Sequence, residues 1–180
     1  AQVEEASFIV PRKAIQEAQR IINEEGEAKL SFADNRATFN LNNVKLITKL
    51  IDGSFPDYNR VIPEETKINM LIKTAELRPA LQRVSILANE KFKGVRIDLS
   101  DDKLTVSSEN PEQEKANETI SIDSTSSNLS VGFNVSYLID AINACDGDLV
   151  SIGLNDENSS ALISDPTDPA SKFVVMPMRL

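Results

Sequence analysis

The sequence predicts an α+β fold built from a repeated strand–helix–strand–strand–strand unit. Three segments of the 180-residue chain show the same order of apolar patterns, about 60 residues apart, and this spacing is typical of an internal repeat. Each segment contains a hairpin with an acidic turn, in the stretches LSFADNRATF, IDLSDDKLTV and IGLNDENSSALI. Two such units side by side allow two helices to cover joined antiparallel sheets. Three units therefore predict one complete domain and half of another.

The first segment opens with a predicted strand at Phe8–Val10 and a helix over residues 11–22, in which Pro11 takes the first helical position. The apolar side of this helix carries Ile15, Ala18 and Ile22. Three strands follow, over residues 29–32, 37–41 and 44–51.

The second segment has the same order. A strand over 68–72 precedes a helix with Thr74 as N-cap, and the strands at 95–99, 104–108 and 117–122 follow. The apolar residues of the helix, which are Leu77, Leu81, Val84 and Ala88, fall on one face.

The third segment completes the chain. A strand over 129–133 leads to a helix that Asn134 caps, and three strands are predicted at 149–154, 160–164 and 173–178. The apolar side of this helix carries Leu138, Ile142 and Cys145.

The composition excludes most enzyme chemistry. Hydrophobic residues make up 41% and charged residues 26%, as in soluble globular domains, and no apolar run is long enough to span a bilayer. The chain has no histidine and one cysteine, so neither a Ser–His–Asp triad nor a thiolate zinc site can form. We expect no cofactor and no metal. The lone thiol and the absence of a signal peptide favour a cytoplasmic location.

Three stretches are candidate binding sites. FPDYNRVIP at 55–63 is either a packed interdomain loop or an extended binding arm, because its prolines disfavour a helix. NEKFKGVR at 89–96 is a basic turn that faces either solvent or phosphate. FVVMPMRL at 173–180 places two methionines near the chain end, as a last strand or as an adaptable apolar wall for a partner.

In order and spacing, these stretches together with NPEQE and GFNVSYLIDA resemble the bacterial DNA sliding clamps, the β subunits of DNA polymerase III. The resemblance covers essentially the whole chain and implies the clamp fold, with antiparallel sheets outside and helices lining the inner face. Family chains have six repeats in three domains, and two chains pair head to tail into a ring around duplex DNA. The resemblance assigns 1–62 to the second half of the middle domain, 63–67 to a linker and 68–180 to the C-terminal domain.

The resemblance implies a processivity factor that is not an enzyme. It tethers the catalytic subunit of DNA polymerase III, the clamp loader and repair polymerases to DNA through their short linear peptides. Part of the family's peptide pocket comes from a stretch that would precede this chain. The remaining positions implied for the pocket are Pro56, Arg60, Val61, Phe92, Asn134, Tyr137, Ser160, Val174, Val175, Met176, Pro177, Met178, Arg179 and Leu180.

The resemblance also assigns two charged surfaces. The net charge of −9 alone predicts repulsion from nucleic acid, but basic residues concentrate on the first two helices. The positions implied to face the DNA backbone are Arg12, Lys13, Arg20, Arg78 and Arg83. The positions implied for the subunit interface are Ile86, Leu87, Glu112, Glu114 and Glu118, although Ile86 and Leu87 also suit an ordinary core.

Two other functions remain open. A carboxylate-based hydrolase would need Asp101 and Asp102 to act together, yet adjacent residues on a strand point to opposite faces. A peptide-binding module without a role on DNA is the third possibility, since half a ring binds peptides without encircling a duplex.

Overall fold

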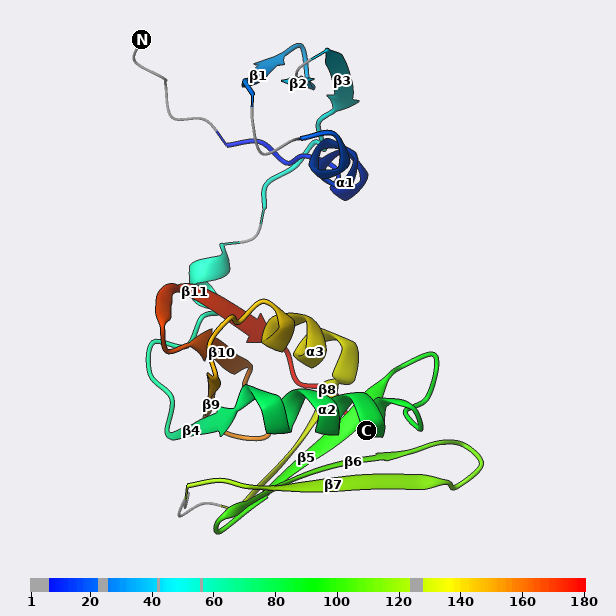
Figure 1. Cartoon of the computed structure of the whole chain (residues 1–180), viewed down its shortest axis with the longest axis vertical. Coiled ribbons are helices and arrows are strands. Elements are labelled where there is room, and N and C mark those ends of the chain that lie inside the picture. Colours follow the sequence, from blue (N-terminus) through cyan, green and yellow to red (C-terminus); the bar gives the residue numbers. More distant parts are fainter. Residues whose placement is uncertain (1–6, 23–25, 42, 56, 124–127) are drawn as a thin grey trace. The chain divides into compact units, whose positions relative to one another are not determined.

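A computed structural model describes residues 7–22, 26–41, 43–55, 57–123 and 128–180. The chain divides into a first unit, Ala1–Asp57, and a second unit, Tyr58–Leu180 (Figure 1). Each unit is described by itself below. None of the described helices is long and apolar enough to cross a membrane.

The second unit contains two four-stranded antiparallel sheets, with the strand orders β11-β10-β9-β4 and β7-β6-β5-β8. Their strands are β4 (Ile68–Lys73), β5 (Gly94–Ser100), β6 (Lys103–Glu109), β7 (Lys115–Ser121), β8 (Leu129–Asn134), β9 (Leu149–Leu154), β10 (Ala161–Asp165) and β11 (Asp168–Val175). The three strands after each helix stay together, whereas the strand before each helix joins the sheet of the other repeat. Thus β4 pairs with β9 and β8 pairs with β5. The two repeats are therefore interlocked rather than placed side by side.

The helices α2 (Thr74–Ser85) and α3 (Val135–Asn143) pack against each other between the sheets, as Figure 1 shows. Asn134 caps α3 as predicted, because its side chain accepts a hydrogen bond from the Ser136 amide at 2.9 Å. The prediction that Thr74 caps α2 is wrong. Thr74 is the first helical residue, and its amide and hydroxyl donate to the carbonyls of Asp148 and Gly147, at 2.9 Å each. A neighbouring loop thus anchors the start of this helix.

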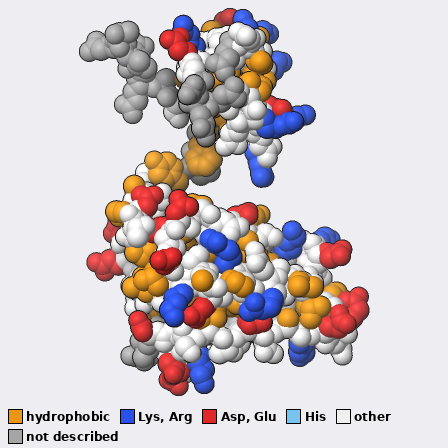
Figure 2. Space-filling view, in the orientation of Figure 1, with side chains coloured by type: hydrophobic (Ala, Val, Ile, Leu, Met, Phe, Trp, Pro, Cys, Tyr) orange, Lys and Arg blue, Asp and Glu red, His pale blue; other side chains and the backbone are white. Residues whose placement is uncertain are grey.

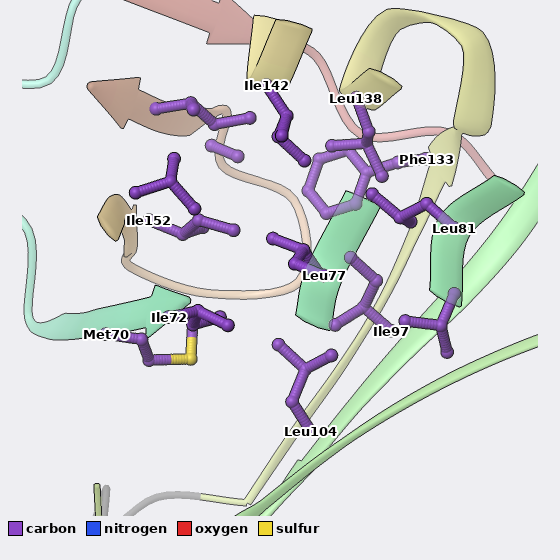
Figure 3. Packing of buried hydrophobic residues seen from close by; sticks show 14 of the residues in the cluster. Met70, Ile72, Leu77, Leu81, Ile97, Leu104, Phe133, Leu138, Ile142 and Ile152 are labelled. Carbon is purple, nitrogen blue, oxygen red and sulfur yellow. The ribbon is translucent and has the colours of Figure 1, made fainter. Parts of the chain in front are cut away.

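The core of the second unit lies between the helices and the two sheets (Figure 3). The predicted apolar faces of both helices are buried in it, down to Cys145 just beyond the end of α3. Leu77 and Leu81 from α2 meet Leu138 and Ile142 from α3 in the same cluster, with Phe133 beside them. Alternation along β5 and β6 supplies further buried side chains, because every second residue of a strand points to the same face.

The first unit has the same element order but a much smaller core. Helix α1 (Arg12–Ile21) packs on a three-stranded sheet of β1 (Ala28–Ala33), β2 (Arg36–Leu41) and β3 (Val44–Lys49). Its buried residues are Ala14, Ala18, Ala37, Phe39 and Leu41. The helix thus buries its alanine flank, whereas Ile15 and Ile22, which the sequence places on the apolar side of the helix with Ala18, are both exposed.

The predicted strand at Phe8–Val10 is also wrong. The segment makes no strand pairing among the described residues, and the amide of Ile51 donates a single backbone hydrogen bond to the carbonyl of Ile9 at 2.9 Å. The Phe8 ring stacks on Phe32 of the same unit, with 4.1 Å between ring centroids. The sequence pattern is that of a strand, but a strand needs a neighbouring edge to pair with.

The last predicted strand is displaced. The pattern places it at 173–178, whereas β11 begins at Asp168 and ends at Val175. Beyond β11, Met178 forms an isolated antiparallel bridge with Gly132 on β8. The chain end therefore leaves one sheet and touches the other.

Candidate functional site

A pocket of about 400 Å³ lies where β11 passes the start of α3. Its lining residues are Asn134, Tyr137, Val174, Val175, Met176, Pro177 and Met178. All seven belong to the positions that the sequence predicted for peptide binding. Tyr137 and Met176 are each 61% exposed although both side chains are largely apolar. Exposed apolar surface inside a hollow is typical of a site that anchors apolar ligand side chains.

Local structure holds the polar end of this pocket in place. The side-chain oxygen of Asn134 is engaged by the Ser136 amide, and its nitrogen donates to the carbonyl of Phe92 at 3.3 Å. Because the residue closes β8 and caps α3, its side chain is fixed by the backbone on both sides. Pro177, two residues after the end of β11, lines the same pocket.

The tail crosses β8 and β5 over two glycines. The amide of Met178 donates to the carbonyl of Gly132 at 2.8 Å, and Leu180 lies over Gly94 and Gly132. A Cβ on Gly132 would collide with the Met178 carbonyl, and a Cβ on Gly94 would collide with the end of the Leu180 side chain. The sequence analysis missed these two glycines. Glycine inside a strand pattern is the signal, because it often marks a close approach of another chain segment.

The remaining predicted peptide positions lie outside the pocket beside α3. Phe92, Arg179 and Leu180 line a second pocket of about 620 Å³ over β5 and β6. Val61 lies next to Ser160, whose hydroxyl donates to the Val61 carbonyl at 3.2 Å. Arg60 ends a short 3-10 helix, Tyr58–Arg60, in the same unit. Pro56 lies outside the described residues.

The predicted DNA-facing residues have different surroundings. Arg12 and Lys13 are exposed at the start of α1, and Arg20 forms an exposed ion pair with Glu17 at 3.3 Å. Arg78 is half-buried and donates to the carbonyl of Ile142, near the C-terminal end of α3, at 3.2 Å. Positive charge at this end of a helix is favourable for the helix dipole, so Arg78 has a structural role whatever else it contacts.

Arg83 and Glu118 link α2 to β7. The guanidinium donates two hydrogen bonds to the carboxylate, at 2.7 and 3.0 Å. This contact lowers the pKa of Glu118 and raises the pKa of Arg83. The structure thus brings together a residue predicted to face DNA and one predicted for the subunit interface. Figure 2 shows acidic and basic side chains interspersed on the visible face of the second unit rather than gathered into one basic patch.

The other predicted interface residues lie near the ends of α2 and β7. Ile86 follows α2 and is 78% exposed, whereas Leu87 is half-buried. Glu114 is held in the loop before β7, where its carboxylate accepts a hydrogen bond from the Asn110 side chain at 2.7 Å. Glu112 is exposed in the same loop. Of the five predicted interface residues, Ile86 is the apolar side chain that is largely exposed to solvent and would become buried only against another molecule.

Candidate catalytic groups are scarce in the described part of the chain. Asp101 and Asp102 form an exposed hairpin turn, and Asp101 has a φ of 48°. No group of three His, Cys, Asp or Glu side chains with the arrangement of a metal site is found among the described residues. The most enclosed carboxylate, Asp165, is fully engaged by the Gly147 amide and by the amide and hydroxyl of Thr167.

The fold, with its interlocked repeats, is that of the sliding clamps. The family model for the C-terminal domain of the DNA polymerase III beta subunit matches residues 59–179, and the model for the central domain matches residues 1–57. The chain belongs to the DNA polymerase III beta subunit family. This confirms the resemblance and the clamp fold that the sequence predicted.

Individual relatives agree with this family assignment. The beta sliding clamp of Vibrio cholerae is 38% identical over 174 residues, and that of Pseudomonas aeruginosa is 40% identical over 173; each match covers 96% of this chain. A crystal structure of the Pseudomonas aeruginosa clamp superposes with a TM-score of 0.87 over 96% of this chain at 40% identity. A Caulobacter crescentus pol III beta structure reaches 0.90 over 99% at 32% identity. The chain spans about half the length of these relatives, 47–48% of each.

Proposed function

We propose that this chain is the peptide-binding part of a DNA polymerase processivity clamp. The pocket beside α3 carries this proposal. Its lining matches the predicted peptide site at seven positions, and it combines exposed apolar surface with the side-chain amide of Asn134, which is held in place by hydrogen bonds. Family membership supports the same function. The chain tethers polymerases, the clamp loader and repair proteins through short peptides and performs no chemistry of its own.

The pocket suits an extended peptide with neighbouring large apolar side chains. Tyr137 and Met176 offer one aromatic and one adaptable wall, and methionine adjusts to differently shaped ligands. The side chain of Asn134 lies at the rim, where a peptide backbone passes. Affinity then comes from burying a few apolar anchors in a preformed hollow, while the polar rim orients the peptide.

Fluorescence polarisation with a labelled peptide containing a Leu-Phe pair tests this proposal. Met176→Ala removes an apolar wall and should weaken binding about ten-fold, the equivalent of ~1–2 kcal/mol of lost burial. Ile86→Ala is the matched control, since Ile86 is also an exposed apolar side chain but lies outside the pocket, and it should leave affinity unchanged. A peptide with both anchors changed to alanine should not bind. Equal affinity for Met176→Ala and the unsubstituted chain would contradict the pocket assignment.

Contact with the DNA backbone is the second part of the proposed function. Arg12 and Lys13 are exposed, and Arg20 is an exposed side chain whose single ion pair with Glu17 is weak enough for phosphate to replace. Such contacts carry no sequence information and weaken steeply with salt. In a closed head-to-tail ring, weak contacts are sufficient because the ring cannot leave a circular duplex.

A peptide-binding module that does not encircle DNA is the alternative, and the engagement of Arg78 and Arg83 within the protein favours it. Retention on nicked circular DNA after a high-salt wash separates the two. Release upon linearisation of the circle indicates a ring, whereas absence from intact circles indicates the module.

The domain assignment is also a proposal: half of a middle domain at 1–62, a linker at 63–67 and the C-terminal domain at 68–180. The cytoplasm of a bacterium, in contact with its nucleoid, is the location that this function implies. The amide of Lys67 donates to the Asn155 side chain at 2.9 Å, and the Asn155 nitrogen donates to the Glu65 carbonyl at 3.1 Å. Through these contacts the C-terminal end of the predicted linker is hydrogen-bonded to the loop that contains Asn155.

A further inference from the structure

The second pocket, of about 620 Å³, lies on the sheet formed by β7, β6, β5 and β8. Arg96, Ser107 and Asn117 line it side by side, because they are paired in register across β5, β6 and β7. Along their strands they alternate with residues such as Val95 and Val106, which are buried in the core. The pocket therefore opens on the face of the sheet that points away from the helices.

This pocket adjoins the pocket beside α3, and two residues connect them. Met178 lines both pockets. Asn134 lines the pocket beside α3, and its side-chain nitrogen donates to the carbonyl of Phe92, which lines the second pocket. A peptide that extends from the first pocket past Met178 therefore reaches the second.

Two large apolar side chains are exposed at the second pocket. Phe92 is 57% exposed and Leu180 is 58% exposed. The turn that carries Phe92 is held by hydrogen bonds: the Asn89 side-chain oxygen accepts from the Phe92 amide at 3.2 Å. The Lys93 carbonyl accepts from the Val135 amide at 2.8 Å, which ties the turn to the start of α3. Such a wall is formed before any ligand arrives, so binding costs little ordering of the protein.

The charged side chains around the second pocket are mostly basic. Among the described lining residues, Arg96, Lys115 and Arg179 are basic and only Glu109 is acidic. Lys115 and Glu109 form an exposed ion pair at 3.1 Å, so they largely neutralise each other. Within the described part of the chain, the guanidinium groups of Arg96 and Arg179 form no ion pair. The pocket thus combines apolar walls with two cations available to a ligand.

We propose that the second pocket extends the peptide groove and binds an acidic side chain that flanks the apolar anchors of the partner peptide. This inference rests on the proposed function, because it concerns the same peptide. The Arg96 guanidinium can bind a carboxylate through two parallel hydrogen bonds, and Ser107 and Asn117 beside it add polar donors. A flank of about three residues, roughly 10 Å of extended chain, is enough to pass one methionine side chain.

A nucleic-acid phosphate is the other ligand with the required charge. The exposed side chains of Phe92 and Leu180 favour a peptide, because they can cover the aliphatic stem of a glutamate. The shared lining residue Met178 favours it too, since it joins this pocket to the site proposed for apolar anchors.

Labelled peptides with the same Leu-Phe pair and different flanks test the inference on the full chain. One has neutral flanks, another has glutamates before the pair, and a third has glutamates after it. By fluorescence polarisation, one of the two acidic peptides should bind about ten-fold more tightly than the neutral peptide at low salt, and this advantage should shrink as salt is added. Equal affinity of all three would overturn the inference and leave the proposed function intact. Failure of every peptide to bind would overturn both.

Substitutions of Arg96 show whether the advantage arises in this pocket. Arg96→Gln should bring the ratio of the acidic-peptide and neutral-peptide affinities to about one. Lys103→Gln is the matched control and should keep the ratio, because Lys103 is an exposed cation on the same face of β6 but outside the pocket. Arg96→Glu should reverse the preference in favour of a peptide with lysine flanks, which a merely structural Arg96 would not do. An advantage that survives Arg96→Gln, or that Lys103→Gln removes equally, would overturn the assignment.

Amide chemical shifts of the nitrogen-labelled chain locate the flank independently. The acidic peptide should shift the amides of Ser107 and Asn117, whereas the neutral peptide should shift amides beside α3, such as that of Tyr137. Shifts confined to the pocket beside α3 with both peptides would contradict the proposal. A short DNA duplex tests the competing ligand. Duplex binding that shifts Ser107 and is lost in Arg96→Gln would assign the pocket to nucleic acid and overturn the proposal.

Discussion

At the scale of single residues, two buried polar side chains, Ser108 and Asp165, make hydrogen bonds whose contribution to the free energy of unfolding can be measured. Ser108 lies under α2, where its hydroxyl donates to the carbonyl of Val84 at 2.8 Å. Ser108→Ala should lower the free energy of unfolding by about 1 kcal/mol, because a buried hydrogen bond to the carbonyl of Val84 near the helix end is lost. Urea denaturation measures this change. Ser107→Ala, on the opposite face of β6, should have a much smaller effect, and equal losses for the two would contradict the argument.

The second residue is Asp165. Hydrogen bonds from the Thr167 hydroxyl, then from the Thr167 and Gly147 amides, lower the pKa of its carboxyl group. A carboxyl group whose pKa is lowered in the folded state contributes stability above its unfolded pKa, about 3.9, and loses it as pH falls through the lower folded value. The free energy of unfolding should therefore decline below about pH 4. In Asp165→Asn this decline should be smaller, while in the exposed turn variant Asp102→Asn it should match the unsubstituted chain.

At the scale of elements, the two helices of the second unit start in different ways. Helix α3 begins with the side-chain cap of Asn134, whereas α2 depends on a neighbouring loop. Asn134→Ala should cost about 1 kcal/mol of stability, and Asn134→Asp should restore most of it because the carboxylate oxygen still accepts from the Ser136 amide. Chemical denaturation of both variants is the measurement. A loss of stability in Asn134→Asp as large as in Asn134→Ala would show that the cap is not the cause.

The C-terminal tail is the other element whose placement can be tested. Gly132→Ala should displace it and weaken peptide binding, because the new Cβ meets the backbone carbonyl of Met178. Gly94→Ala should do less, since its Cβ meets only the flexible end of Leu180. Peptide affinity by fluorescence polarisation and the amide exchange rate of Met178 report the two effects. Unchanged exchange in Gly132→Ala would show that the tail is held in another way.

At the scale of the whole molecule, the two units differ in how much core they have. The second unit buries a large cluster from eight strands and two helices, and the first unit buries only a few side chains. The first unit should therefore unfold at lower denaturant than the second. Hydrogen exchange should show fast amides over 12–49 and slow amides in β5 and β6. A single cooperative transition for both units would contradict this prediction.

Much of the fold could be predicted because its signals are local. The spacing of apolar and turn residues predicted the repeated order of helix and three strands, the hairpin turns, and the apolar faces of α2 and α3. The structure confirms these features. Family resemblance predicted a peptide-binding role for positions 134, 137 and 174–178, and the structure places these residues around one pocket. The cap at Asn134 is likewise local, since the residue, the helix start and the bonded amide lie within three positions.

The rest depended on contacts between distant segments. Three such contacts could not be read from neighbouring residues. They are the exchange of β4 and β8 between the repeats, the anchoring of Thr74 by a loop 73 residues away, and the packing of Leu180 on two glycines. Sequence alone thus determined the order of the helices and of most strands, because side-chain periodicity and caps act over a few residues. Only the tertiary structure decided whether those faces are buried. Ile15 and Leu77 have the same apolar pattern, but Leu77 is buried in a core to which both repeats of the second unit contribute, whereas Ile15 is exposed in a first unit whose described residues form one repeat.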